Sequence, residues 1–245
     1  MEPVGDTMTR TTETAPNDII IGVDLAQAKD WTAIVVAEVL TSVTDGPNRY
    51  AIRAIRREQP RRYQDTVAMV ADALPALREG VHVLQPNQRN YDYVQPSVTV
   101  VLDRTGVGRA VGDMFSEARL DCRLELVTIT SGHQVNRDDD GGWLVPKKDL
   151  TATVAVALQN GLIEWPARHP LDPILRGELK NFRHRYSATG RESSGAGDDW
   201  REGNHDDLVL AVALSLWWGE RRQAGNMTPE DYEYTAACLR AGGFG

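Results

Sequence analysis

The stretch from Ile19 to Ala26 constrains the fold most, because it reads as a buried strand that ends on a carboxylate. Four of its first five residues are β-branched, which is typical of a strand covered on both faces. Asp24 interrupts this apolar run, and a buried carboxylate is costly unless a positive group stabilises it. Asp24 therefore indicates a metal ligand, a partner of a cationic group, a residue at the mouth of a cleft, or a cap on the following turn.

The overall composition is ordinary for a soluble globular protein of one or two domains, with 41% apolar and 25% charged residues in 245. We find neither an apolar run of the ~20 residues that a membrane helix needs nor an N-terminal signal-peptide pattern. Cys122 and Cys238 have no metal-binding spacing, so we expect a reduced, cytoplasmic protein. The net charge of −8 argues against indiscriminate nucleic-acid coating but is compatible with a metal-dependent nuclease, which needs clustered acids.

Apolar periodicity and turn residues predict one folded domain over residues 18–222, between a flexible leader (1–17) and a C-terminal tail with a short helix (223–245). The first half should form an antiparallel meander of three strands, at 19–24, 31–39 and 50–55. A helix at 63–77 and an excursion loop at 85–96 should follow. Pro75 should kink that helix or end it early. The second half should hold strands at 97–102, 124–129 and 162–165, helices ending near 119 and spanning 147–159 and 171–182, a loop at 186–204 and a final helix.

Three further carboxylates stand at the ends of these predicted elements. Asp103 follows the buried strand 97–102 and precedes a glycine-containing turn, and Asp206 and Asp207 open the last long helix. The pair could be ordinary caps, because the helix dipole favours acids in the first turn. Acids at two strand ends and one helix start are also the residue types that a shared metal site needs.

Other polar candidates have simpler structural interpretations. Asp30 is expected to organise a turn, the run Asp138–Asp140 a solvated loop, and His205 a structural contact. Basic clusters at Arg49–Arg62, Lys147-Lys148 and Lys180–Arg185 could contact phosphates or form solvated surface; the first has six arginines and one acid.

Four motifs follow one another along the chain: Gly22-Val23-Asp24-Leu25-Ala26 with Asp30-Trp31-Thr32-Ala33, Leu102-Asp103-Arg104-Thr105-Gly106-Val107-Gly108, Val145-Pro146-Lys147-Lys148-Asp149-Leu150, and His205-Asp206-Asp207-Leu208-Val209. Together they resemble the nuclease domain of the large terminase subunit of tailed bacteriophages, a member of the RNase H-like superfamily. The resemblance spans about residues 19–220 and implies an α/β fold with a central mixed sheet, in which an antiparallel meander is joined by parallel strands and flanked by helices.

The resemblance also implies a DNA endonuclease that cuts concatemeric duplex DNA during head filling, by two-metal phosphodiester hydrolysis. Asp24, Asp103 and one or both of Asp206 and Asp207 would hold two Mg²⁺ or Mn²⁺ ions about 3.5–4 Å apart, which activate water and stabilise the leaving oxygen. The second acid is glutamate in some relatives and aspartate here. Basic side chains would bind the DNA backbone, namely Arg104, Lys147, Lys148, Arg183 and Arg185.

The expected partners are double-stranded DNA and the rest of a packaging machine, with no membrane involved. The expected location is the host cytoplasm if the protein is viral, as the resemblance implies. The sequence lacks a Gly-x-x-x-x-Gly-Lys-Ser/Thr phosphate loop, so an ATPase motor, a small terminase subunit and a portal would be separate, or this chain would be an excised domain. Three alternatives stay open: a Holliday-junction-resolvase-like nuclease, a non-catalytic DNA-binding or packaging module of the same fold, and an actin- or sugar-kinase-like ATPase.

Overall fold

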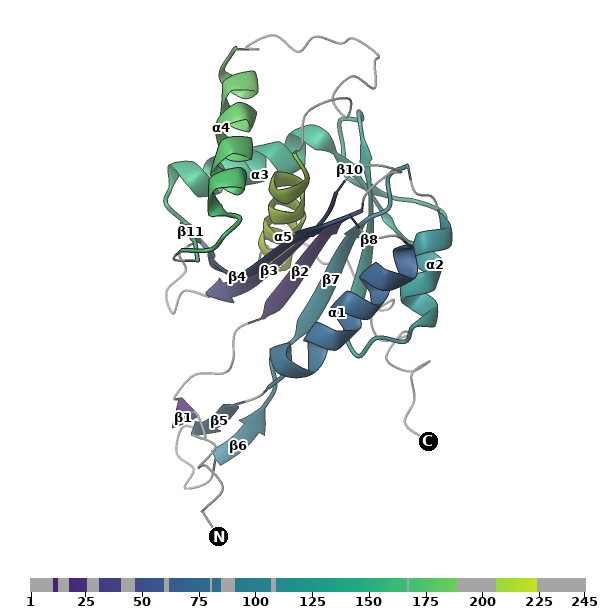
Figure 1. Ribbon diagram of the computed structural model, residues 1–245, viewed down its shortest axis with the longest axis vertical. Coiled ribbons are helices and arrows are strands. Elements are labelled where there is room, and N and C mark those ends of the chain that lie inside the picture. The colour runs from purple at the N-terminus through teal and green to yellow at the C-terminus, as the bar shows by residue number, and fades with distance from the viewer. Residues whose placement is uncertain are drawn as a thin grey trace.

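An eight-stranded mixed sheet forms the centre of the protein in the computed structural model (Figure 1). The structure describes residues 11–12, 18–25, 31–40, 47–59, 62–79, 81–84, 91–106, 109–166, 168–188 and 206–223. Of these, only the backbone is described at 11–12, 81–84, 91–94, 109, 181–188 and 223. The predicted helix after Thr228 and most of the predicted 186–204 loop lie outside these ranges.

The strand order of the large sheet is β11-β4-β3-β2-β7-β8-β10-β9. Its members are β2 (Ile19–Asp24), β3 (Thr32–Leu40), β4 (Arg49–Glu58), β7 (Val98–Asp103), β8 (Arg123–Thr130), β9 (Asn136–Arg137), β10 (Trp143–Pro146) and β11 (Ile163–Glu164). Strands β2, β3 and β4 form the expected antiparallel meander, and β7, β8 and β10 continue the sheet in parallel with β2. The predicted α/β, RNase H-like sheet is therefore confirmed.

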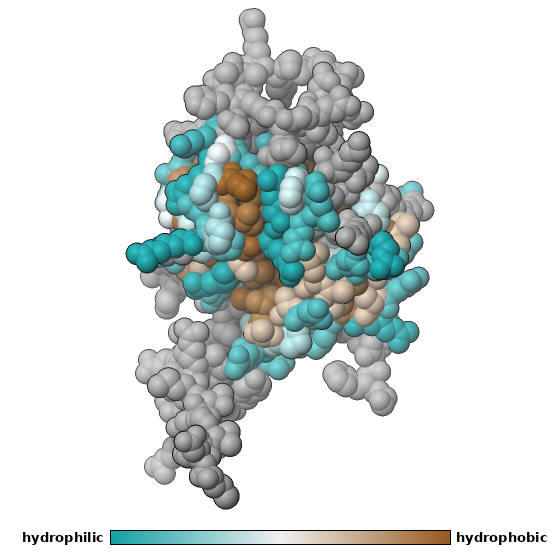
Figure 2. All heavy atoms as spheres, viewed as in Figure 1, coloured by the Kyte–Doolittle hydropathy of each residue, from teal (hydrophilic) through white to brown (hydrophobic). Residues whose placement is uncertain are grey.

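Helices cover both faces of this sheet (Figure 1). One apolar cluster joins the sheet to α1 (Tyr63–Leu77) and α2 (Arg109–Glu117), and the other joins it to α3 (Lys147–Gln159), α4 (Asp172–Ala188) and α5 (Asp207–Gln223). Every side chain from Leu208 to Trp218 is buried, because α5 packs on the middle of the sheet while α3 and α4 contact it from outside. Figure 2 shows the Figure 1 face, where hydrophilic residues flank an apolar strip.

A second, three-stranded sheet lies at one end of the molecule, away from the large sheet (Figure 1). It consists of β1 (Thr11–Thr12), β5 (Val81–Leu84) and β6 (Tyr91–Val94). The interpretation of residues 85–96 as a loop was wrong at 91–94, because this Tyr-Asp-Tyr-Val segment pairs antiparallel with β5. Thr11 and Thr12, inside the expected leader, pair with β5 as well.

Two helices continue past residues at which the sequence allowed them to end. Helix α1 continues through Pro75 to Leu77, since a proline in the last turn removes one hydrogen bond without interrupting the turns before it. Helix α4 reaches Ala188, so residues 186–188 are helical instead of belonging to the predicted loop. No helix among the described residues has the length and apolar character to cross a bilayer.

Candidate active site

Asp24 and Asp103 lie side by side at the same end of the large sheet. Strands β2 and β7 are parallel neighbours, and their register places Asp24 directly opposite Asp103. The same transverse row continues through Ala33 on β3 to Arg57 on β4. Because this is where parallel strands end, it is the edge at which α/β sheets place their reactive groups.

Both acids point to the face of the sheet that α5 covers. Side chains alternate along a strand, so Asp24 shares a face with Ile20 and Gly22, and Asp103 shares one with Val101. Ile20 and Val101 belong to the apolar cluster that contains α5. Gly22 is a point of close approach between β2 and α5, since a Cβ there would overlap the Ala211 carbonyl oxygen and the Ser215 hydroxyl. This close packing explains the glycine two residues before Asp24.

The second pair of acids stands where α5 begins. Asp206 is the N-cap of this helix, because its carbonyl oxygen accepts the first helical hydrogen bond, from Leu210 N–H at 2.9 Å. Asp206 is only 9% exposed. Asp207 follows it as the first helical residue. The packing of α5 against β2 therefore brings a third chain segment with a carboxylate to the face that holds Asp24 and Asp103.

A hydrogen-bonded turn fixes the backbone after Asp103. The Thr105 N–H donates to Asp103 Oδ1 at 2.7 Å, and the Thr105 hydroxyl accepts from Ile129 N–H at 2.7 Å. Between them, Arg104 N–H donates to the Val127 carbonyl at 2.8 Å. The turn is thus held against β8, and Asp103 combines a structural contact with its place in the row of acids.

The predicted ligands are all carboxylates, which suit a hard divalent cation, and two of them, Asp24 and Asp103, also lie next to each other. Carboxylate oxygens are the ligands that Mg²⁺ and Mn²⁺ prefer, and Asp24 and Asp103 present theirs from neighbouring strands. Within the described ranges, no three His, Cys, Asp or Glu side chains converge closely enough to hold an ion. The structure thus brings together two of the predicted ligands and places the helix with the others on the same face.

Asp207 is engaged in a largely buried ion pair that the sequence did not reveal. Its Oδ2 accepts hydrogen bonds from Arg57 Nη2 at 2.9 Å and from Arg57 Nε at 3.3 Å. The Arg57 guanidinium also lies over the Trp31 ring, 5.1 Å from its centroid, and 3.9 Å from Glu178 Oε1. The Arg57 and Glu178 side chains are 9% and 6% exposed, so this cluster is shielded from solvent.

Glu178, on α4, binds the N-terminus of α5. Its Oε2 accepts the backbone N–H groups of Leu208 at 3.0 Å and Val209 at 3.2 Å. Burial raises the pKa of Glu178 from an ordinary value of 4.5 to about 7, and nearby Asp207 adds to this, while the two N–H groups and Arg57 oppose it.

We expect this buried glutamate to make folding stability depend on pH. Between pH 4.5 and 7 the folded state holds a proton on Glu178 that the unfolded state has lost, so stability falls as pH rises through this window. Above pH 7 the ionised Glu178 lowers the free energy of unfolding by about 3 kcal/mol relative to its value below pH 4.5. The variant Glu178→Gln should lose this slope, as measured by urea unfolding at several pH values. Parallel slopes for the two proteins would contradict the assignment.

The predicted DNA-contacting residues differ in how the structure places them. Arg104 is not available to DNA, because it is 8% exposed, forms an ion pair with Asp138 and donates to Thr128 Oγ1 at 3.2 Å. Lys147 is half-buried, whereas Lys148 is exposed and lies 3.3 Å from His133 Nδ1. The side chains of Arg183 and Arg185 lie outside the described part of the chain.

The arginine-rich segment 49–62 is less basic than its composition suggests. Arg49, Arg53 and Arg56 form ion pairs with Glu164, Glu38 and Glu58, and Arg57 pairs with Asp207 as described. The acidic run that starts at Asp138 closes the turn between β9 and β10, as its loop interpretation predicted. Asp30 and His205 lie outside the described residues.

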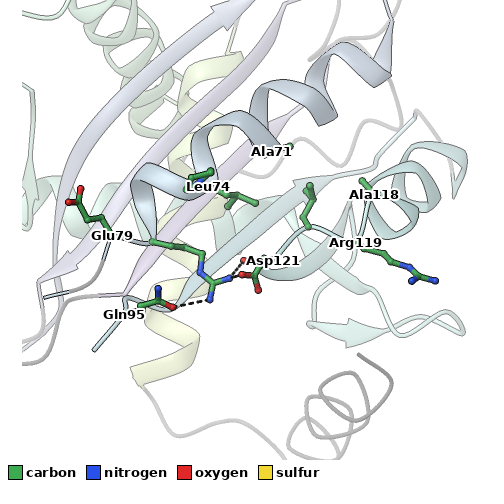
Figure 3. Close-up of a pocket in the computed structure, with 10 residues that line it drawn as sticks. Ala71, Leu74, Glu79, Gln95, Ala118, Arg119 and Asp121 are labelled. Carbon is green, nitrogen blue, oxygen red and sulfur yellow. Dashed lines mark hydrogen bonds and ion pairs between the residues drawn. The ribbon is translucent and has the colours of Figure 1, made fainter. Parts of the chain in front are cut away.

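A cavity of about 650 Å³ lies at the opposite end of the parallel strands, between the ends of α1 and α2 (Figure 3). Gln95 precedes β7 and Asp121 precedes β8, so the cavity is at the strand starts, away from the acids. Arg78 binds both of them, donating to the Asp121 carbonyl at 2.6 Å and to Gln95 Oε1 at 3.4 Å, while Arg119 points away (Figure 3). The cavity therefore takes no part in the candidate site.

Comparisons with known proteins give a distant likeness among solved structures. No protein-family model matches the sequence, and no curated protein matches it. Among solved structures, the chain is similar to a human cytomegalovirus terminase nuclease domain, in a Mn-soaked, inhibitor-bound structure. The identity is 11%, the alignment covers 86% of each chain, and the TM-score is 0.49. A likeness at this level describes backbone arrangement only, and the site rests on the residues of this chain.

Proposed function

We propose that this chain is a metal-dependent DNA endonuclease of the terminase-nuclease type. The observation that carries the proposal is the in-register placement of Asp24 and Asp103 on the face where α5 begins with Asp206. The motifs around these acids resemble those of phage terminase nucleases in order and spacing, which supports duplex DNA as the substrate.

In this proposal Asp24, Asp103 and an aspartate of the 206–207 pair hold Mg²⁺ or Mn²⁺. The metal supplies activation of water and stabilisation of the leaving oxygen when it is bound. The protein contributes the row of strand ends and the docked helix, so Asp24 and Asp103 are held side by side before substrate arrives. Exposed Lys148 is available to bind a DNA phosphate from outside this row.

A non-catalytic DNA-binding or packaging module is the second candidate. Two observations favour it: Asp207 is paired with Arg57, and no three acids converge within the described ranges. Such a module would still bind duplex DNA through surface charge, and a packaging ATPase, small terminase subunit and portal would be its partners as they would for the nuclease.

The two candidates are separated by incubating the purified chain with supercoiled plasmid and Mn²⁺ or Mg²⁺. We expect nicked and linear products that a chelator prevents, and equal cutting of linear duplex and four-way junctions. Preference for junctions would favour a resolvase. DNA binding without cutting at any metal concentration would favour the non-catalytic module, and nucleotide hydrolysis without DNA cleavage would favour the actin-like alternative.

A further inference from the structure

Asp206 and Asp207 occupy consecutive positions at a helix start and so face in different directions. Asp206 is the N-cap, which has non-helical backbone angles, whereas Asp207 is the first helical residue. One of these directions is defined by the structure: Asp207 Oδ2 accepts two hydrogen bonds from Arg57, and the Asp207 side chain is 15% exposed. The two acids therefore have different environments, which the sequence alone does not distinguish.

The backbone groups that an N-cap aspartate ordinarily binds are bound by another helix. For an N-cap at Asp206, these are the N–H groups of Leu208 and Val209. Both donate to Glu178 Oε2. Glu178 therefore caps α5 from α4 and holds the start of this helix.

Glu178 has a second oxygen that capping does not use. Oε1 is fully buried, has no hydrogen-bond partner and lies 3.9 Å from Arg57 Nη2. A buried carboxylate oxygen in this state is costly unless a positive charge offsets it. Arg57 supplies this charge while it is held between Asp207 and the Trp31 ring. Arg57, Glu178 and Asp207 thus form one support, which we call the α5 clamp.

The α5 clamp is connected directly to the row of strand-end acids. Arg57 lies on β4 opposite Ala33, and Ala33 lies opposite Asp24 on β2. A rigid contact from Arg57 to the start of α5 therefore fixes that helix start relative to Asp24 and Asp103. Removing one partner of an ion pair this deeply buried lowers the free energy of unfolding strongly, because the other charge is left buried and unpaired.

We propose that Arg57 and Glu178 are positioning residues that set Asp206 as the α5 ligand of the metal, and that Asp207 belongs to this clamp. This inference rests on the proposed metal site. It assigns different roles to the two adjacent aspartates, one to the metal and one to the guanidinium.

The test measures Mn²⁺ binding directly, by electron paramagnetic resonance of the free ion, at a temperature where circular dichroism shows each variant folded. Asp206→Asn should raise the Mn²⁺ dissociation constant at least tenfold, roughly the effect of losing a ligand or its orienting partner. Asp207→Asn keeps an oxygen that can accept from Arg57 but loses the charge, so it should lower the free energy of unfolding yet change that constant much less. Glu164→Ala, at an exposed position on β11, serves as the control.

Glu178 separates positioning from direct ligation. Glu178→Ala removes the cap and should weaken Mn²⁺ binding roughly 10- to 100-fold. Glu178→Gln keeps an oxygen that can accept both N–H groups, so it should bind Mn²⁺ nearly as well as the parent chain. Equal loss in both variants would make Glu178 a ligand, and equal retention in both would exclude a positioning role; either result overturns the inference.

The roles of the two aspartates are overturned if Asp207→Asn loses Mn²⁺ while Asp206→Asn keeps it. Failure of the nuclease proposal is distinguishable from this result. A chain that shows the expected Mn²⁺ binding pattern but never cuts plasmid keeps the inference and overturns the nuclease proposal. A parent chain that binds no Mn²⁺ overturns the inference and the metal site together.

Discussion

Replacing Asp24 or Asp103 by asparagine should reduce Mn²⁺-dependent plasmid cleavage at least ~100-fold, because loss of a metal ligand should cost no less than loss of a group that merely orients one. Asparagine keeps the size of the side chain and, at position 103, an oxygen that can accept the Thr105 N–H. The protein should therefore stay folded. Rates of nicking measured on supercoiled plasmid give the activity, and urea unfolding gives the stability.

Unlike most substitutions of buried residues, these two should not lower the folding stability of the metal-free protein. Two carboxylates directly opposite on neighbouring strands repel each other in the absence of metal, so either variant should be at least as stable as the parent without Mn²⁺. Added Mn²⁺ should raise the melting temperature of the parent only. Asp113→Asn, an exposed aspartate on α2 across the sheet, should behave like the parent. Unchanged cutting by either variant would remove these acids from the site.

Gly22→Ala should lower the free energy of unfolding by about 3 kcal/mol and abolish cleavage with it. The new methyl would overlap the Ala211 carbonyl oxygen and the Ser215 hydroxyl. Most of this obstruction is backbone, so relief requires α5 to move away from β2. Displacement of α5 also moves Asp206 away from Asp24, and activity should fall even where the variant remains folded.

Gly177→Ala provides the matched control for this substitution. Gly177 lies within α4, where an added Cβ would meet nothing within 4 Å. A glycine inside a helix is less stable than alanine by about 0.5–1 kcal/mol, so this variant should gain stability. Urea unfolding measures both, and near-UV circular dichroism reports the cluster of Trp143, Trp217 and Trp218 between β10 and α5. Similar stability changes at positions 22 and 177 would contradict the packing argument.

The sequence predicted those parts of the fold that depend on local pattern. The buried strands that end on Asp24 and Asp103 appear as expected, as does α3 over Lys147–Gln159, because an apolar face and helix-ending residues suffice to define them. The segment Tyr91–Val94 was missed because it is a strand through its pairing with β5. The Asn, Gln and Pro residues around it in the sequence favour a loop instead.

The sequence identified the acids of the candidate site but not the residues that contact them. A glutamate such as Glu178 in the middle of a helix has no sequence signal that separates it from a solvated one, and its partners at 208 and 209 are 30 and 31 residues away. Arg57 was grouped with a basic cluster because only the fold brings it to Asp207. Gly22 carried a usable signal, since a glycine inside a β-branched strand indicates close backbone approach.

The position of α5 has a consequence for when the candidate site can form. Asp24 is near the start of the described chain, whereas α5 is its last described element and fills the middle of one sheet face. A polypeptide still emerging from the ribosome therefore exposes that apolar face and lacks the third carboxylate. Under the proposed function, cleavage of DNA would begin only once translation has passed Gln223, so unfinished chains would not cut the nucleic acid around them.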